Sequence, residues 1–270
     1  MFSFRALASG SSGNAFLLRT AQVALLFDAG LRMPSLARYL LLEGIAPEDL
    51  NAAFISHEHR DHCLSAGDLI AEHNVPIWAN AEVLVTTRLH GLDSVHELSV
   101  GRPTQFCDVE VVTFPVHHDS VRPVGFLIRV EDMTIVIATD LGHAGREVHR
   151  AVAQADLLVI EANYDPNMLE TGRYPRRLRR RVAGLNGHLS NQQAAQLICE
   201  RAKNRSISVW LAHLSKENNA PALAVRTVNQ AISRSKLSGL QVEVAKRDRP
   251  SLSWSGESAP RQLSLFGRAS

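Results

Sequence analysis

Cysteine is scarce in this chain of 270 residues, which contains only Cys63, Cys107 and Cys199. These residues are odd in number and lack CxxC spacing, so they predict neither a disulfide framework nor a thiolate zinc site. Such sparse use of cysteine is typical of proteins in a reducing compartment. We therefore expect a cytoplasmic protein.

Long apolar segments and an excess of one charge are also missing. No window is long enough to span a bilayer, and residues 1–5 do not begin a charged and then apolar signal segment. The sequence thus predicts no membrane partner. The net charge is only +2, with 29 basic and 27 acidic residues, so binding to nucleic acid would need a local basic patch.

Short segments of β-branched and apolar residues are separated by segments with helical periodicity. We expect strands at residues 15–19, 23–27, 52–55, 109–114, 125–130, 134–139, 157–161, 206–212 and 240–245. We expect helices at residues 33–43, 64–72, 81–88, 145–153, 191–203 and 221–233. Runs of strands with helices between them predict a layered α/β protein, in which two sheets lie between layers of helices.

A dense group of metal-binding residue types follows the apolar residues 53–55. His57, His59, Asp61 and His62 lie within six residues of one another. Where the chain turns after a strand, His57 and His59 can face one metal ion, while Asp61 and His62 face another. Imidazole and carboxylate groups are typical zinc ligands, with manganese and iron as competitors. The alternative is a polar, histidine-rich surface loop.

Ionisable residues also end several other apolar segments. Asp140, Glu161 and His213 each follow a predicted strand, and His117 and His118 follow residues 111–116. Buried charged groups are costly unless they are paired or coordinated. In layered α/β folds, ligands bind beyond the carboxyl ends of the strands. Several such residues together therefore indicate a metal centre more than isolated structural histidines.

The HxHxDH motif at 57–62, a later histidine, a strand-end aspartate and a final histidine are together similar to the metallo-β-lactamase-fold hydrolases. This resemblance implies an α/β protein with the four-layer αββα sandwich of that fold. The segment 187–190, followed by a helix, and the segment 211–215 resemble the region of tRNase Z that holds a catalytic and a zinc-binding histidine. Closer still is the resemblance to the YycJ/WalJ-type nucleases, in the segments 9–14, 56–62, 118–119, 187–191 and 213–219.

The resemblance to these nucleases also implies the ligands of two divalent metal ions, zinc or manganese. The ligands of one ion would be His57, His59 and His118, those of the other Asp61, His62 and His213, and Asp140 would bridge the two. A bridging carboxylate is physically reasonable because two neighbouring cations repel each other. His117 is an alternative to His118, which we favour because the following Asp119 fits the family pattern.

The implied activity is that of a phosphodiesterase, and we expect a DNA exonuclease of replication or repair. Two metal ions would supply a hydroxide near neutral pH and bind the phosphate oxygens. Asp61 would also orient the hydroxide. The leaving oxygen needs a proton, which His188 would donate with Glu161 orienting it. A capping or packing role is the alternative for His188.

Two segments are candidates for contact with the nucleic-acid backbone. The turn at residues 9–14 is rich in glycine and hydroxyl groups, and Ser11 and Asn14 would help to hold a phosphate. Six arginines lie between residues 173 and 181, and we expect Arg176, Arg177 and Arg180 to contact phosphates. A solvated loop without a partner is the alternative for the arginine segment.

The chain changes in composition near residue 246, so we expect a catalytic domain at residues 1–246 and a disordered tail at 247–270. The tail contains the segment 262–266, which is similar to the pentapeptide with which bacterial proteins bind the replication sliding clamp. Gln262 would supply an amide hydrogen bond, and Leu263, Leu265 and Phe266 would enter an apolar pocket. A chance match, or packing of this segment on the domain, is the alternative.

Three other functions remain possible from the sequence. An RNA-processing nuclease of the tRNase Z type would use the same residues. A thioester hydrolase of the glyoxalase II type, or a lactamase, also carries HxHxDH, although the segment 187–190, Glu161 and the arginines favour phosphodiesters. A non-enzymatic adaptor that acts through its tail is disfavoured because all seven expected ligands are present.

Overall fold

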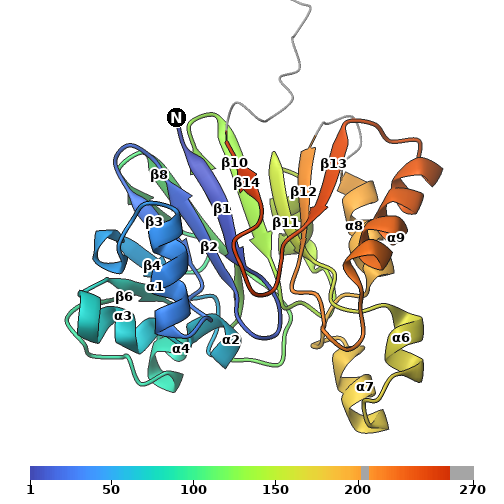
Figure 1. Cartoon of the computed structure of the whole chain (residues 1–270), viewed down its shortest axis with the longest axis horizontal. Helices are drawn as coiled ribbons and strands as arrows, with labels where there is room; N and C mark the ends of the chain where they lie inside the picture. The colour runs from blue at the N-terminus through green and yellow to red at the C-terminus, as the bar shows by residue number, and fades with distance from the viewer. Residues whose placement is uncertain (202–206, 256–270) are drawn as a thin grey trace, which may run out of the picture.

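Two sheets of seven strands each pack face to face and are covered by helices on their outer faces, as the computed structural model shows (Figure 1). The structure describes residues 1–201 and 207–255. This arrangement confirms the expected αββα sandwich. No helix among the described residues is long and apolar enough to cross a membrane.

The first sheet has the strand order β14-β1-β2-β3-β4-β5-β6. Its strands are β1 (Ser3–Ala8), β2 (Ala15–Arg19), β3 (Ala24–Phe27), β4 (Ala52–Phe54), β5 (Ile77–Ala79), β6 (Val95–Glu97) and β14 (Ser253–Trp254). The pairs from β14 to β3 are antiparallel, and those from β3 to β6 are parallel.

The second sheet has the strand order β13-β12-β11-β10-β9-β8-β7. Its strands are β7 (Pro103–Phe106), β8 (Val109–Pro115), β9 (Val124–Val130), β10 (Met133–Ala138), β11 (Leu157–Glu161), β12 (Ile207–Ala212) and β13 (Leu240–Val244). Here too an antiparallel part, β7 to β10, is followed by a parallel part, β10 to β13. The parallel strands of each sheet therefore end at one edge, where side chains beyond them can meet.

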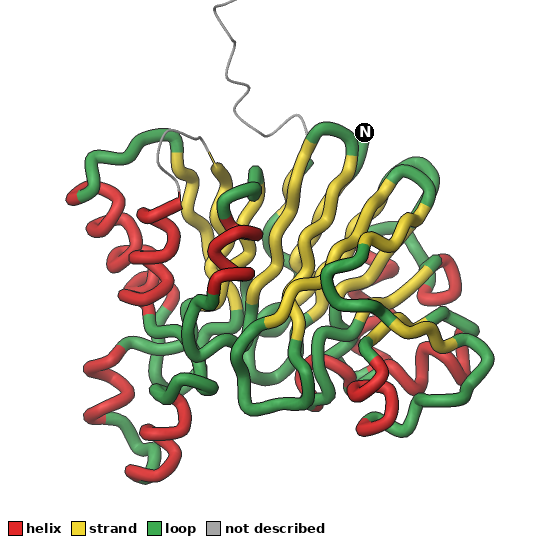
Figure 2. The backbone as a smooth tube through the Cα atoms, turned by 180° about the vertical axis from the view of Figure 1, so that it is seen from behind, coloured by secondary structure: helices red, strands yellow, loops and turns green. Residues whose placement is uncertain are grey.

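The helices are α1 (Met33–Leu42), α2 (Arg60–Cys63), α3 (Ala66–His73), α4 (Ala81–Thr86), α5 (Arg146–Val152), α6 (Pro166–Thr171), α7 (Arg176–Val182), α8 (Asn191–Arg201) and α9 (Pro221–Arg234), with a 3₁₀ turn at Pro47–Asp49. Apolar residues of α1, α3 and α4 pack on the first sheet, and those of α5, α8 and α9 pack on the second. A third cluster, rich in aromatic residues such as Phe4, Phe54 and Trp210, fills the space between the sheets. Figure 2 shows the same layers from behind.

Helices α6 and α7 stand apart from the layers and project below α8 and α9 in Figure 1. They belong to the segment between β11 and α8, which the sequence did not predict to be helical. The arginine segment, for which a solvated loop was the alternative, thus contains α7, whose Leu178 packs in a small cluster with Tyr164 and Leu169. The arginines are therefore presented on an ordered surface.

Several other boundaries differ from those expected. β1, β5, β6, β7 and β14 were missed, because short or partly polar strands such as Val95–Glu97 lack a clear alternating pattern. The helix expected at 64–72 corresponds to α3, and it is preceded by the short helix α2, which was not expected and begins at Arg60. There the backbone carbonyl of His59 accepts hydrogen bonds from the N–H groups of His62 and Cys63.

The expected start of a disordered tail at residue 247 is wrong. Arg247 donates hydrogen bonds to the carbonyls of Leu214 and Ser215, at 3.0 and 2.7 Å. Trp254 is buried and pairs with Phe4 as part of β14. The folded part thus extends at least to residue 255, because a buried indole gives this segment a place in the core. The clamp-binding-like residues 262–266 lie outside the described residues.

Candidate metal centre

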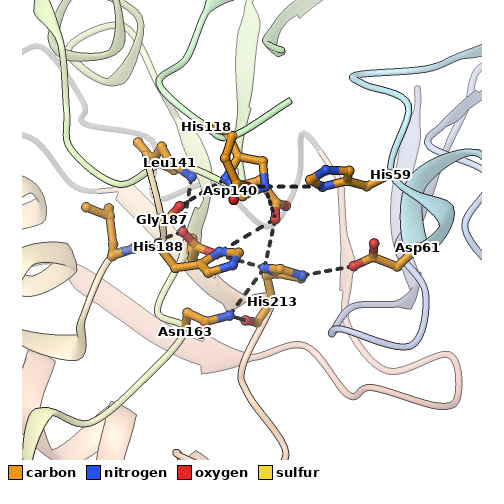
Figure 3. Close-up of polar contacts among 12 residues, drawn as sticks. His59, Asp61, His118, Asp140, Leu141, Asn163, Gly187, His188 and His213 are labelled. Carbon is orange, nitrogen blue, oxygen red and sulfur yellow. Dashed lines mark hydrogen bonds and ion pairs between the residues drawn. The ribbon is translucent and has the colours of Figure 1, made fainter. Parts of the chain in front are cut away.

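Four strands of the two sheets deliver their following residues to one place. The segment from His57 to His62 follows β4, His118 follows β8, Asp140 follows β10 and His213 follows β12. Figure 3 shows His59 and Asp61 approaching the residues of the second sheet from the opposite side. The candidate site therefore lies where the edges of the two sheets meet.

The first group consists of His57, His59 and His118, whose candidate ligand atoms lie within 4.8 Å of one another. The Nδ1 atom of His118 lies 3.0 Å from the carbonyl oxygen of Gly187, so it must carry the hydrogen and leave Nε2 as an acceptor. That Nε2 is 3.3 Å from Nδ1 of His59. Nε2 of His57 is buried and has no hydrogen-bond partner within the described part of the chain.

The second group consists of Asp61, His62 and His213. One carboxylate oxygen of Asp61 lies 3.2 Å from Nε2 of His213 and 3.7 Å from Nε2 of His62. Nδ1 of His62 is 2.7 Å from the Asp28 carboxylate, which also accepts a hydrogen bond from the Ser56 N–H at 2.9 Å. Asp28 therefore fixes the His62 ring with Nε2 toward the site.

Asp140 lies between the two groups. Its Oδ2 is 3.0 Å from Nε2 of His62 and has no hydrogen-bond donor assigned to it among the described residues. Its Oδ1 is 3.4 Å from Nδ1 of His213 and 3.7 Å from Nε2 of His118. When His62 donates from Nδ1 to Asp28, its Nε2 lone pair faces a carboxylate oxygen. Two acceptors at this distance need a positive charge between them, so these residues fit divalent cations.

The pKa shifts of the histidines in this cluster also indicate that its carboxylates need positive charge nearby. Burial lowers the pKa of His62, but Asp28 and Asp140 outweigh it and raise the pKa well above its usual value. Burial likewise opposes protonation of His213, yet Asp140, Asp61 and Glu161 raise its pKa to about 10. For His57, burial prevails and lowers the pKa. In the absence of metal, protons on His62 and His213 would compensate the carboxylates, and metal ions would have to displace those protons.

Glu161 and His188 lie on one side of this cluster. Oε1 of Glu161 is 2.8 Å from Nδ1 of His188 and 2.7 Å from Nδ1 of His213, and Oε2 accepts hydrogen bonds from the N–H groups of Leu141 and Leu189. Glu161 is fully buried, whereas the His188 side chain is 20% exposed. Burial opposes protonation of His188, but Glu161 raises its pKa. His188 also belongs to a possible metal-binding group with Asp140, Glu161 and His213.

Asp28, Asp140 and His213 share an unusual backbone conformation, with φ values of 60°, 56° and 51°. This left-handed region is uncommon for residues other than glycine, although aspartate and histidine tolerate it better than most. Each of the three ends a buried strand and turns its side chain into the site. Such local strain is typical of functional positions, where the surrounding fold maintains it.

The structure brings together the seven expected ligands as well as Glu161 and His188. His118 is buried in the cluster, whereas His117 is exposed and packs against His143 with ring centroids 4.0 Å apart. The geometry therefore favours His118 over the neighbouring histidine.

Asn14 does not have the expected position for a phosphate contact. Its side chain is fully buried and accepts hydrogen bonds from the Gly10 N–H and the Ser9 hydroxyl, while its amide nitrogen lies 3.0 Å from Nε2 of His62. The backbone N–H of Asn14 also donates to the carbonyl of Asp61 at 2.8 Å. Asn14 thus supports the loop of the ligands, because its polar groups are already used. Ser11, in contrast, is exposed and lines a pocket.

Two residues near the site were not among those expected to act. Asp28 follows β3, so the rule that identified Asp140 at the end of a strand could also have found it. Asp119 forms an ion pair with Arg181 of α7, and its other carboxylate oxygen is 3.4 Å from Nε2 of His118. No sequence pattern indicated this link between α7 and the candidate metal centre.

The other arginines differ in their surroundings. Arg176, Arg177 and Arg180 are exposed on α7. Arg176 and Arg180 line a cavity of about 420 Å³ between α6 and α7. The structure therefore presents all three expected arginines to solvent, on the element that Arg181 ties to the site.

A family model described as a β-lactamase superfamily domain matches residues 24–209. The exodeoxyribonuclease WalJ of Streptococcus pneumoniae serotype 2 is 36% identical over 242 residues, covering 87% of this chain and 90% of that protein. The exodeoxyribonuclease YycJ of Bacillus anthracis is 31% identical over 233 residues, covering 85% and 88%.

Comparison with solved structures also indicates the metallo-β-lactamase fold. The metallo-β-lactamase-fold protein YhfI of Bacillus subtilis superimposes with a TM-score of 0.71 at 18% identity, covering 94% of this chain and 99% of that one. The chain thus belongs to the β-lactamase superfamily and, within it, to the WalJ/YycJ family of metal-dependent nucleases.

Proposed function

We propose that this protein is a DNA exonuclease of replication or repair that uses two divalent metal ions, zinc or manganese. The observation that carries the proposal is the pair of ligand groups on either side of Asp140, with two buried atoms, Nε2 of His57 and Oδ2 of Asp140, that have no hydrogen-bond partner in the described part of the chain. The names of the relatives WalJ and YycJ support DNA as the substrate.

The residues fit a division into two metal sites. His57, His59 and His118 would hold one ion, Asp61, His62 and His213 the other, and Asp140 both. Divalent ions at such a site acidify water and neutralise the charge of a phosphodiester. Asp61 is the ligand best placed to orient the attacking group as well, because it is partly exposed while His62 and Asp140 are buried.

His188 is the proposed proton donor to the leaving oxygen. It is partly exposed at the edge of the cluster, and Glu161 holds its Nδ1 at 2.8 Å. Since this bond uses Nδ1, Nε2 is the ring atom that would meet the substrate. Because Glu161 is itself held by two backbone N–H groups, it can fix the direction of the His188 ring.

The exposed arginines Arg176, Arg177 and Arg180 are proposed to bind the phosphate backbone. They lie on α7, which the Arg181–Asp119 ion pair connects to the metal-facing end of β8. Contacts of this kind position a strand without reading its sequence. They favour a polyanionic substrate over a thioester or a lactam.

A chemical assay separates DNA cleavage from its alternatives. The purified protein, loaded with manganese or zinc, would be incubated with end-labelled DNA, RNA of the same sequence, S-lactoylglutathione and a chromogenic lactam. We expect release of mononucleotides from DNA, and none from the Asp140→Asn variant. Faster cleavage of RNA would favour a tRNase Z-type function, and turnover of the thioester alone would overturn the nuclease proposal.

We further propose that the protein acts in the cytoplasm and that Gln262, Leu263, Leu265 and Phe266 bind the sliding clamp. A tethered nuclease would be concentrated at newly made DNA without any new contact in its site. Purified clamp would be titrated against the whole chain and against a variant ending at Pro260. Equal affinity of the two would exclude the tail from clamp binding.

A further inference from the structure

A pocket of about 280 Å³ adjoins the candidate metal centre on the side of the first sheet. It is lined by Ser11, Ser12, Gly30, Arg32, Arg60, Asp61 and Leu64. Asp61 is at the same time one of the second group of candidate ligands. A group bound in this pocket would therefore lie next to whatever is bound at the metals.

The walls of the pocket are held rigidly by contacts between three loops. The N–H of Gly30 donates to the carbonyl of Asn14 at 3.0 Å, and the N–H of Asn14 donates to the carbonyl of Asp61 at 2.8 Å. A Cβ atom on Gly30 would overlap the carbonyl oxygen of Asp61, so only glycine permits this approach. The loops therefore form the pocket without needing a ligand to order them.

The charges of the pocket are unbalanced. Arg32 and Arg60 are both exposed, and neither side chain forms a hydrogen bond or ion pair with the residues described in the structure. Asp61 is the sole acidic residue of the lining, and it is already turned toward His213 at 3.2 Å. Ser11 and Ser12 add exposed hydroxyl groups. Two free guanidinium groups with hydroxyl groups nearby match the oxygens of a phosphate.

We propose that this pocket binds the phosphate of the substrate strand that neighbours the scissile phosphate. This proposal rests on the proposed nuclease function, since it names a second contact of the same strand. Arg32 and Arg60 bind the neighbouring phosphate, and the rigid loop places it at a fixed position relative to Asp61. The scissile group is thereby aligned by a contact that does not take part in the chemistry.

The test compares substrates that differ only in the neighbouring charge. Trinucleotides carry an uncharged methylphosphonate on the 5′ or the 3′ side of the scissile phosphate, and bis(p-nitrophenyl) phosphate carries no neighbouring phosphate at all. The variant is the double substitution Arg32→Gln and Arg60→Gln. The double substitution Arg102→Gln and Arg226→Gln is the control, because these exposed arginines lie outside the pocket and the change in net charge is the same.

For the wild type, we expect one of the two methylphosphonates to lower kcat/KM by about 10- to 100-fold, as for a lost hydrogen bond to a charged group. The Arg32/Arg60 variant should lose this discrimination and cleave bis(p-nitrophenyl) phosphate at the wild-type rate, while the control keeps the discrimination. If neither methylphosphonate changes kcat/KM of the wild type, the pocket does not bind a neighbouring phosphate. The proposal is also overturned if the Arg32/Arg60 variant is equally impaired on all substrates. A wild type inactive on every phosphodiester would instead overturn the nuclease function.

Discussion

In the N-terminal half of the sandwich, four candidate ligands follow the single strand β4, whereas in the C-terminal half His118, Asp140 and His213 each follow a different strand. Both halves have the same arrangement of an antiparallel part and a parallel part in one sheet. The N-terminal ligands depend on one loop and its supports, Asn14, Asp28 and Gly30. The C-terminal ligands depend on the register of neighbouring strands, such as Glu161 opposite Ala212.

Substitution of Asp140, which contacts residues of both halves, should have the largest effect. Asp140→Asn keeps the size of the side chain but removes the charge that faces His62 and His213. We expect no detectable nuclease activity and loss of most bound metal, with the fold retained by circular dichroism. An active Asp140→Asn enzyme would show that the two halves work without a shared ligand.

His188 tests whether a residue of the C-terminal half can act without holding metal. His188→Gln should lower kcat by ~10²–10⁴-fold, as for loss of a general acid. Metal content, measured by elemental analysis, should stay at the wild-type level. If the metal content decreases in parallel with the rate, His188 is a ligand in the group with Asp140 and His213, and the proposed proton donor is wrong.

The same contrast explains how much the sequence could predict. The segment from His57 to His62 can be recognised as a metal-binding motif from the sequence alone, because its ligands lie close together in the chain. Asp140, Glu161 and His213 could be predicted only as the polar ends of buried strands, and the resemblance to known nucleases was needed to assign roles. Asp28 was missed although it also ends a strand, because the aspartate alone does not indicate that His62 will lie 2.7 Å away.

The other differences between the expected and the observed structure arise from tertiary contacts. The arginine segment became helix α7 because Leu178 and Val182 have an apolar cluster to join, which no local pattern reveals. Asn14 resembles a phosphate-binding residue in sequence but is enclosed by the loop of Asp61 and His62. Trp254 extends the fold beyond residue 246, because it packs beside Phe2 with ring centroids 5.6 Å apart.

Asp28 tests the supports of the N-terminal half. Asp28→Asn removes the carboxylate charge that faces Nδ1 of His62. We therefore expect metal affinity to fall by about 10- to 100-fold, the usual effect of losing a residue that orients a ligand. The loss should affect the site of Asp61, His62 and His213 more than the other. A competition titration with a chromogenic chelator measures the affinities of the two metal sites. If both affinities fell equally, the loop would move as a whole.

Substitution of the exposed arginines Arg176, Arg177 and Arg180 should have the smallest effect, because these side chains are not among the candidate metal ligands. Replacement of Arg176, Arg177 and Arg180 by glutamine should raise KM for DNA and leave kcat unchanged. The dependence of DNA binding on salt concentration should become shallower, since fewer counterions are released. DNA binding would be measured in a catalytically inactive variant, so that the substrate stays intact. If its salt dependence is unchanged by the substitutions, α7 is not part of the substrate-binding surface.

The central claim, that the two halves together form one centre for two metal ions, is tested most directly by counting metal. Protein purified without chelator would be analysed for zinc and manganese, and the same preparation assayed on end-labelled DNA. We predict about two equivalents per chain, and loss of both metal and activity after chelation, restored together by added ions. A chain that is fully active with one equivalent, or with none, would contradict the account.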